Sequence, residues 1–360
     1  MTQENTLIPL AQVEKLLREK WLVTGVPGAA RACTLNLVVV LAHVDERPAV
    51  QDLLAQTIQR YPNRALIIVP DNDTPEPGMA ASVRVSCPGA AAHLYCCEQI
   101  TIHVREDVWR HAHSAVLPLL LPELPVNIWW HRALDLEDPL FERLQTLADG
   151  LLVDAAAQED PVSTIRALGQ VYDRFLWGAM DLSWARLTPW RELIAQAFDP
   201  MERRPYLWGI EHVTVSATPT PAGTAAALYL VGWLAGRLGW TPQSTWRTRG
   251  RTRELHFTRG ETPILVTVTR SRHDYPTPLV RVRLVARSTT TARFTIEVGE
   301  EPDLVHITTD VGSVHVRQTV RTRWPEQAHA LGEALRINGQ DRIFREALDI
   351  VLSLLPSSNS

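Results

Sequence analysis

Lysine is almost missing from this chain. Lys15 and Lys20 are the only lysines among 36 basic residues, so nearly every positive charge is carried by arginine. Arginine favours planar, paired contacts with carboxylates and phosphates over loose solvation. The formal net charge of −4 provides no overall attraction to nucleic acid or to an anionic membrane. We therefore expect neither nucleic acid nor membrane among the partners.

Cysteine is also scarce, with Cys33, Cys87, Cys96 and Cys97 in 360 residues. Four cysteines are too few for a disulfide scaffold of this size, and they form no CxxC pair. His93 lies close to two of them, but a zinc site needs a fourth ligand at usable spacing. The pattern predicts reduced thiols and no bound metal.

No apolar run is long enough to cross a membrane. The longest, 35–42 and 225–236, fall short of the ~20 residues that a bilayer requires. The first six residues lack the basic start and apolar core of a signal peptide. We expect a cytoplasmic location.

The usual catalytic signatures are absent as well. There is no GxGxxG after a strand, no GxxxxGK[ST], no HExxH and no GxSxG. The sequence therefore predicts no catalytic residues, no cofactor and no enzymatic activity.

What the chain does contain, up to residue 177, is an alternation of helices and buried strands. A helix over 8–21 opens the chain, and residues 1–29 are assigned to this helix and a linker. Apolar or alternating stretches predict strands at 33–42, 65–70, 82–87, 95–104, 125–131 and 150–156, with helices at 48–61, 107–121, 138–148 and 161–177. This order predicts a three-layer α/β domain with a mostly parallel sheet over 30–177.

After residue 177 the pattern changes to strands without helices between them. A strand at 211–217 and a helix at 222–239 precede strands at 252–258, 263–270, 279–287, 292–298, 303–309 and 313–321, and helices at 326–336 and 341–355 follow. We expect an α+β domain over 178–356, with an antiparallel sheet and helices on one face. The last four residues, 357–360, are predicted to be a disordered tail.

A candidate ligand pocket lies where the strands of the first domain end. Trp130, His131 and Asp154 stand at such ends, and open α/β sheets bind ligands there. The alternative is structural: the tryptophan packs in the core, His131 is a hydrogen-bonded edge residue and Asp154 caps a loop.

The stretch "DLSWARLTPWRELIAQAFD", 181–199, contains a helix start. Thr188 is expected at the N-cap and Pro189 at the first helical position. From Trp190 onward, the apolar residues recur with helical spacing and form a single stripe, so Trp190 is expected in a core.

Three other residues of this stretch have less defined roles. Trp184 and Arg186 precede the predicted cap and belong to a connector between the domains. Arg191 lies on the side of the helix that the stripe does not bury. Arg186 and Arg191 are candidate partner contacts, and a solvated helix face is the alternative.

A third cluster is basic. In "RTRGRTRE", 247–254, every second residue from Arg247 to Arg253 is an arginine, and Arg281, Arg283 and Arg287 show a similar spacing. On strands, each set would line one face. Arg249, Arg251 and Arg253 are candidates for docking an acidic partner or a phosphorylated ligand, while the wet face of a sheet is the alternative.

Several long strings resemble the glucose-6-phosphate dehydrogenase assembly protein family OpcA. They are "ARACTLNLVVV" (30–40), "CEQITI" (97–102), "HSAVLPLLLPELPVNIWW" (113–130), "DPLFERLQTLAD" (138–149), "VD" (153–154) and 181–199. The resemblance implies a non-catalytic assembly factor or allosteric activator of that dehydrogenase in the oxidative pentose phosphate pathway.

The resemblance also leaves two points to be decided. Thioredoxin control in cyanobacterial members is attached to cysteines toward the C-terminus, whereas this chain has none after Cys97. The alternative function is an enzyme or sensor that binds a phosphorylated metabolite, a sugar phosphate or a nucleotide, at the strand ends of the first domain.

Overall fold

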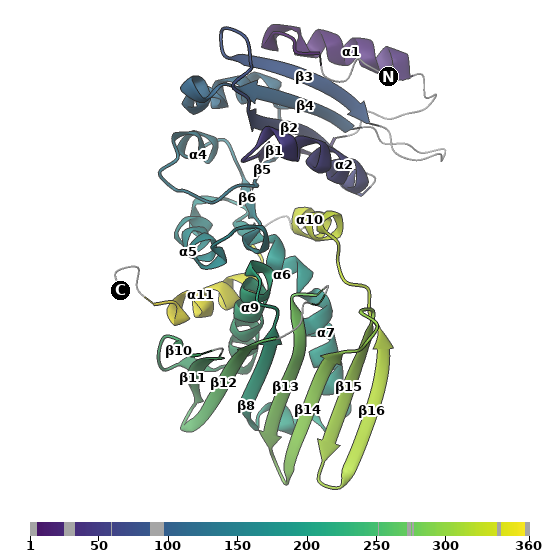
Figure 1. Ribbon diagram of the computed structural model, residues 1–360, viewed down its shortest axis with the longest axis vertical. Coiled ribbons are helices and arrows are strands. Elements are labelled where there is room, and N and C mark those ends of the chain that lie inside the picture. Colours follow the sequence, from purple (N-terminus) through teal and green to yellow (C-terminus); the bar gives the residue numbers. More distant parts are fainter. Residues whose placement is uncertain are drawn as a thin grey trace. The chain divides into compact units, whose positions relative to one another are not determined.

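The computed structural model describes residues 6–24, 33–58, 60–86, 97–250, 252–271, 275, 277–336 and 340–356. The chain divides into two compact units. The first comprises Met1–Asp154, Gln170–Met180 and Gln327–Gln340, and the second comprises Ala155–Gly169, Asp181–Glu326 and Asp341–Ser360. Each unit thus takes segments from distant parts of the chain (Figure 1). The domain boundaries expected from the sequence stay a prediction. None of the described helices is long and apolar enough to cross a membrane.

The first unit is built on a seven-stranded sheet with the order β3-β4-β2-β1-β5-β6-β7. Neighbouring strands are parallel from β4 to β6, and β3 pairs antiparallel with β4. This confirms the mostly parallel sheet and the predicted hairpin. The strands are β1 (Leu35–Val40), β2 (Asn63–Pro70), β3 (Met79–Ser86), β4 (Cys97–Val104), β5 (Val126–Trp130), β6 (Gly150–Val153) and β7 (Ala179–Asp181).

The central strands of this sheet are buried along their length. Every residue of β1, β5 and β6 is buried, as is β2 up to Val69. Burial on both faces explains why these strands read as continuous apolar runs rather than as alternating ones. It is the burial pattern expected of a three-layer α/β arrangement.

The helices of the first 180 residues are shorter than the sequence predicts. The helix expected over 107–121 is instead three short helical segments, and Pro118, which lacks the N–H of a continuing helix, lies in the last of them. The helices expected to end at 148 and 177 end at Leu144 and Val171. The helical segments are α1 (Val13–Thr24), α2 (Arg47–Thr57), α3 (His113–Val116), α4 (Pro139–Leu144) and α5 (Pro161–Val171), with 3₁₀ turns at Leu10–Gln12, Val44–Glu46, Glu106–His111, Leu117–Leu119, Ala155–Ala157 and Tyr172–Arg174.

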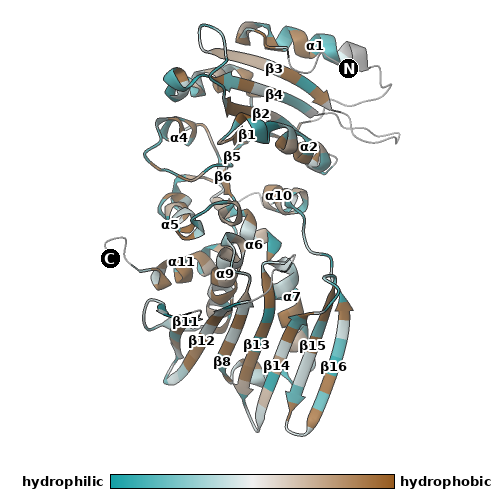
Figure 2. Cartoon of the chain, viewed as in Figure 1, coloured by the Kyte–Doolittle hydropathy of each residue, from teal (hydrophilic) through white to brown (hydrophobic). Residues whose placement is uncertain are grey.

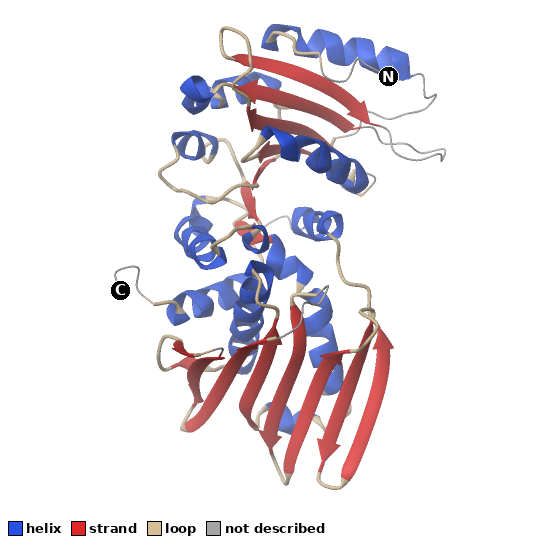
Figure 3. Cartoon of the chain, in the orientation of Figure 1, coloured by secondary structure: helices blue, strands red, loops and turns tan. Residues whose placement is uncertain are grey.

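The second unit is built on a nine-stranded sheet, shown with its long run of strands in Figure 3. All its recorded pairings are antiparallel except that of β12 with β8, so the expected antiparallel sheet is confirmed with one parallel step. The strands are β8 (Ile210–Ala217), β9 (Thr241–Pro242), β10 (Arg247–Arg249), β11 (Thr252–Arg259), β12 (Thr262–Arg270), β13 (Leu279–Arg287), β14 (Thr291–Val298), β15 (Leu304–Val311) and β16 (Val314–Arg321).

The helix α9 is the central helix of the second unit. Thr220 caps its start by accepting a hydrogen bond from the Gly223 amide, and Gly239 ends it at φ 65°, a conformation that glycine adopts without strain. The residues of α9 itself are apolar and buried on most sides of the helix, which is typical of a buried helix. The remaining helices of the chain after residue 180 are α6 (Leu182–Arg186), α7 (Thr188–Ala197), α8 (Arg204–Leu207), α10 (Gln327–Arg336) and α11 (Arg342–Leu354), of which α10 belongs to the first unit.

The two faces of the nine-stranded sheet differ in character, as the alternating colours of its strands in Figure 2 show. On β8, Val213 and Val215 are fully buried, whereas the intervening Thr214 and Ser216 are half-buried. The same alternation continues on β13, where Val282 and Leu284 are buried and Arg283 is exposed. We call the side that carries Thr214 and Arg283 the open face.

Candidate functional site

The expected pocket residues at the strand ends of the first unit do not form a pocket together. Trp130 is fully buried, packs edge-on against Phe141 and donates a hydrogen bond from Nε1 to the Ala133 carbonyl. Asp154 follows β6 and is only 2% exposed. His131 is half-buried, with Nδ1 3.5 Å from a carboxylate oxygen of Glu46. Burial thus favours the structural alternative for Trp130 and Asp154.

A cleft does lie at the strand ends, but other residues line it. It follows the carboxyl ends of β1, β2, β4 and β5, where the order of an open parallel sheet reverses and ligands usually bind. Its volume is about 840 Å³. The lining is strongly acidic, with carboxylates from Asp45, Asp71, Asp73, Glu106, Asp135, Glu137 and Asp138. Arg132 is the arginine of this lining, and it lies over the Trp109 ring and 3.9 Å from Asp138. The charge of this cleft disfavours a phosphate.

The first unit contains one polar cluster that the sequence did not predict. The His103 ring contacts Asp71 through Nδ1 at 2.8 Å and the Ser82 hydroxyl through Nε2 at 3.2 Å. This is the order of groups in a serine hydrolase triad, in which the hydroxyl must reach a substrate. Ser82 and His103 are each only 3% exposed, and neither lines the strand-end cleft. The sequence gives no signal for it, because the three residues stand on separate elements.

The protonation of His103 follows from its surroundings. Burial lowers the pKa of this imidazole, although the hydrogen bond to Asp71 acts in the opposite direction. Arg47 approaches the same ring nitrogen, Nε2, at 3.5 Å and also disfavours the charged form. A neutral ring that donates from Nδ1 to Asp71 satisfies all these contacts. The cluster therefore serves as a buried polar connection between strands.

The stretch 181–199 lies in the second unit and is largely internal. Trp190, Leu193, Ile194, Ala197 and Phe198 are all at most 3% exposed, so the predicted apolar stripe is confirmed. Trp190 stacks on Trp324, with ring centroids 5.5 Å apart.

The predicted start of this helix is off by one residue. Leu187 occupies the N-cap without a side-chain hydrogen bond, and Thr188 is already the first residue of α7. The Thr188 hydroxyl instead accepts a hydrogen bond from Arg191, at 2.8 Å. Pro189, expected at the first helical position, is the second residue of α7 and still lies in its first turn. An arginine three residues ahead thus takes the threonine oxygen that would otherwise cap a backbone amide.

Arg191 does not lie on an open helix face, which corrects the expectation from the sequence. Its guanidinium lies 3.8 Å from the centre of the Trp184 ring. Burial lowers the pKa of Arg191 to about 10, while the carboxylates of Asp341 and Glu192 act in the opposite direction. Trp184 in turn donates from Nε1 to Asp341, which caps the start of α11. Arg191 and Trp184 therefore join α7 to α11.

Arg186 and Asp181 flank the same junction. Arg186 is half-buried and has interactions of its own. Asp181 is fully buried and accepts hydrogen bonds from the Ser183 amide and the Tyr229 hydroxyl, both at 2.8 Å. A buried carboxylate with this set of donors holds α6 against α9. The sequence placed Trp184 and Arg186 in a connector, whereas they belong to a packed helix.

The arginines of 247–254 do not share one face. Gly250, at φ +59°, turns the chain between β10 and β11, so Arg247 and Arg249 stand on a different strand from Arg253. Arg249 pairs with Thr252, whereas Arg253 pairs with Thr248, which puts Arg249 and Arg253 on opposite faces of the hairpin. Arg251 lies outside the described residues. The unbroken alternation in the sequence concealed this turn.

The open face of the nine-stranded sheet nevertheless gathers many arginines. Arg281, Arg283 and Arg287 share it, as predicted. Its arginines are Arg247, Arg249, Arg281, Arg283, Arg287, Arg293, Arg317 and Arg321. Arg281 pairs with Glu297, Arg287 with Glu211 and Arg321 with Asp303. Within the described parts of the chain, the other five have no ion pair.

Two domain families match consecutive stretches of this chain. Residues 55–170 match the "glucose-6-phosphate dehydrogenase subunit N-terminal domain", and residues 177–348 match the corresponding C-terminal domain. The chain belongs to the OpcA family. The residues that suggested this resemblance in the sequence lie mostly within the two matched stretches.

Two cyanobacterial relatives show the same similarity. An OxPP cycle protein OpcA of Synechocystis sp. is 34% identical over 51% of this chain, and one of Synechococcus elongatus is 32% identical over 57%. The matches cover 38% and 45% of those relatives' own lengths, so the chain corresponds to less than half of each. Among solved structures, an oxidoreductase of Bacillus subtilis, yvaA, shows 10% identity and a TM-score of 0.49 over 89% of this chain and 96% of that one.

Proposed function

We propose that this chain is a non-catalytic assembly factor and allosteric activator of glucose-6-phosphate dehydrogenase. The observation that carries the proposal is the match of both halves to domains described as parts of one subunit of that enzyme. The named relatives associate the family with the oxidative pentose phosphate cycle. The expectations of no catalytic residue and no cofactor are part of this proposal.

The open face is the surface that best suits a protein partner. Arg249, Arg283 and Arg317 are exposed there and have no ion pair within the described residues. Arginine is enriched in protein interfaces, because its planar guanidinium pairs with two carboxylate oxygens at once. The partner surface is therefore expected to be acidic. Of the arginines proposed from the sequence, Arg249 fits this role, whereas Arg191 and Arg253 point into the second unit.

An activator acts only if it binds the active state of the enzyme more tightly than the inactive one. A tenfold shift in that population requires a preference of ~1.4 kcal/mol, which a modest interface can supply. The substrate and the chain should then strengthen each other's binding to the dehydrogenase by linkage.

The alternative function has less support. An enzyme or sensor for a sugar phosphate or nucleotide at the strand ends of the first unit would place an anion in a cleft lined by carboxylates. Trp130, His131 and Asp154, which would have held the ligand, do not line this cleft.

The direct test is association with the dehydrogenase of the same organism. Purified chain and enzyme are mixed at micromolar concentration, with and without glucose 6-phosphate, and their complex is measured by analytical ultracentrifugation. We expect one complex of fixed stoichiometry that tightens with substrate. Separate sedimentation in both conditions contradicts the proposal.

A further inference from the structure

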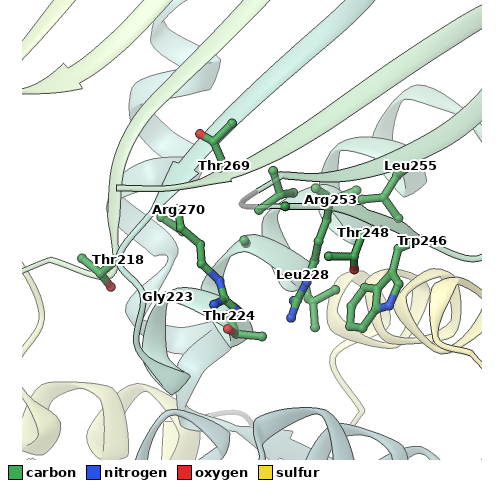
Figure 4. Close-up of a pocket in the computed structure, with 15 residues that line it drawn as sticks. Thr218, Gly223, Thr224, Leu228, Trp246, Thr248, Arg253, Leu255, Thr269 and Arg270 are labelled. Carbon is green, nitrogen blue, oxygen red and sulfur yellow. The ribbon is translucent and has the colours of Figure 1, made fainter. Parts of the chain in front are cut away.

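A second hollow lies within the second unit, between the first turns of α9 and the strands β10 to β12. Its volume is about 240 Å³. Apolar residues of α9, among them Leu228 and Val231, form its floor, and Leu255 and Val268 contribute from the strands. Figure 4 shows this pocket with Arg253 and Arg270 reaching from the strands toward α9. Threonines share the lining with these apolar residues, so the hollow is part apolar and part polar, with two cationic groups at its edge.

The two arginines come from neighbouring strands and the same face of the sheet. Arg253 on β11 pairs across to Val268 on β12, and Arg270 stands two positions further along β12. Such diagonal neighbours lie within reach of long side chains. Arg253 is held 4.4 Å from the centre of the Trp246 ring. Trp246 thus fixes one guanidinium while Arg270 remains exposed at the rim.

No carboxylate among the described residues compensates these charges. Neither Arg253 nor Arg270 has an ion pair within the part of the chain that the structure describes, and no acidic side chain lines the pocket. Burial lowers the pKa of the Arg253 guanidinium, and the charge of Arg270 lowers it further. Two like charges in a partly desolvated site gain from an anion that lies between them, because it relieves both the repulsion and the lost hydration.

Hydroxyl groups surround the same space. Thr218, Thr224 and Thr248 line the pocket, and the hydroxyls of Thr224 and Thr248 have no hydrogen bond to any described residue. A threonine hydroxyl donates and accepts, which suits the hydroxyls of a sugar. The 18-residue helix α9 also directs its N-terminal partial positive charge toward this end of the pocket.

We propose that this pocket binds a small sugar phosphate, with the phosphate between Arg253 and Arg270 and the sugar against the threonines and Leu228. The size restricts the ligand. Sites for larger, drug-sized ligands measure roughly 300–1,000 Å³, whereas this pocket has about 240 Å³. One phosphate and one ring match the available space better than a dinucleotide. The proposal concerns ligand binding by this chain alone and does not depend on its association with the dehydrogenase.

The test is isothermal titration calorimetry of the full chain with four probes: glucose 6-phosphate, glucose, inorganic phosphate and NADP⁺. We expect saturable binding of glucose 6-phosphate, weaker binding of inorganic phosphate and none of glucose. Arg253→Gln and Arg270→Gln should each weaken glucose 6-phosphate binding by about tenfold or more, because each removes a charge-assisted hydrogen bond. Arg143→Gln, at an exposed residue of the first unit, is the control and should bind like the unmodified chain.

Thermal denaturation of each variant separates loss of the site from loss of the fold. Without ligand, Arg270→Gln should melt at the same temperature as the unmodified chain or higher, because it removes a like-charge repulsion. Glucose 6-phosphate should raise the melting temperature of the unmodified chain and of Arg143→Gln, but not of the two pocket variants. Equal affinity of inorganic phosphate and glucose 6-phosphate, tighter binding of NADP⁺, undiminished binding by folded pocket variants, or no binding of glucose 6-phosphate at ~10 mM would each overturn the proposal.

Discussion

The two sheets of this protein use charged residues in opposite ways. In the first unit even an ion pair is buried: Arg64 is 2% exposed and lies 2.6 Å from Glu98, which is fully buried. In the second unit Arg281 pairs with Glu297 on the open face, where both side chains are more than a third exposed. A sheet with both faces buried uses charge to satisfy its own interior, whereas a sheet with an open face can present charge to other molecules.

The two hollows also differ in the charge of the residues that line them. The strand-end cleft of the first unit occupies the place where topology predicts a ligand, but carboxylates line it. The smaller pocket of the second unit was not predicted, yet it holds two arginines that have no acidic partner among the described residues. Topology thus predicts the place of the first hollow only, and side-chain charge determines what each hollow can bind.

The largest expected effect comes from breaking the buried pair of the first sheet. Arg64→Met should lower the free energy of unfolding by about 3–5 kcal/mol, because it leaves the Glu98 carboxylate buried without its counter-ion. Arg281→Gln on the open face should lower the free energy of unfolding by less than ~1 kcal/mol. Urea denaturation measures both. Equal losses would show that the two sheets do not differ as described.

The next effect concerns the interior of the second unit. Trp190→Ala should lower the free energy of unfolding by about 3–5 kcal/mol, because it empties a packed aromatic site. Activation of the dehydrogenase should fall only in proportion to the fraction of the chain that is unfolded. A Trp190→Ala protein that melts normally and fails to activate would place Trp190 on the partner surface instead.

A smaller effect is expected at the buried serine of the first sheet. Ser82→Ala should lower the free energy of unfolding by about 1 kcal/mol, because it removes one hydrogen bond to His103. It should leave activation of the dehydrogenase unchanged. Loss of activation in a folded Ser82→Ala chain would show that the Ser82, His103 and Asp71 cluster has a role beyond structure.

The same cluster should make stability sensitive to acid. The folded chain lowers the pKa of His103, so the unfolded chain binds more protons as the pH falls below about 6.5. The contribution of His103 to stability is therefore present above that pH and is lost as the pH falls toward the lowered pKa. Melting temperatures between pH 8 and pH 5 should decline less steeply for His103→Gln. If the melting temperatures of His103→Gln and the unmodified chain fall equally with pH, His103 is not a cause of the acid sensitivity.

The elements of the fold were largely predictable because most of them are long and regular. The six strands between Thr252 and Arg321 alternate in hydropathy, and each was expected within a few residues of its place. The site was harder to predict. The alternation of arginines hid the turn at Gly250, and nothing in the sequence shows that Arg191 lies over Trp184 or that Arg253 lies over Trp246. Such contacts depend on which elements pack together, and local spacing carries no information about that.

The open face offers a matched test of partner binding by charge. One variant carries Arg249→Gln, Arg283→Gln and Arg317→Gln, all on the open face of the second unit. The control carries Arg60→Gln, Arg110→Gln and Arg143→Gln, which are exposed residues of the first unit. The two variants have the same change in net charge. Only the first should associate more slowly with the dehydrogenase and lose part of its salt sensitivity.

The central claim is that this chain activates glucose-6-phosphate dehydrogenase without turnover of its own. The most direct measurement is the initial rate of NADPH formation at limiting glucose 6-phosphate, as the unmodified chain, the open-face variant and the control variant are each titrated into the enzyme. We predict no rate from the chain alone, a rise that saturates at fixed stoichiometry with the unmodified and control chains, and a weaker rise with the open-face variant. An enzyme rate that does not change with the unmodified chain at saturating concentration would contradict the account.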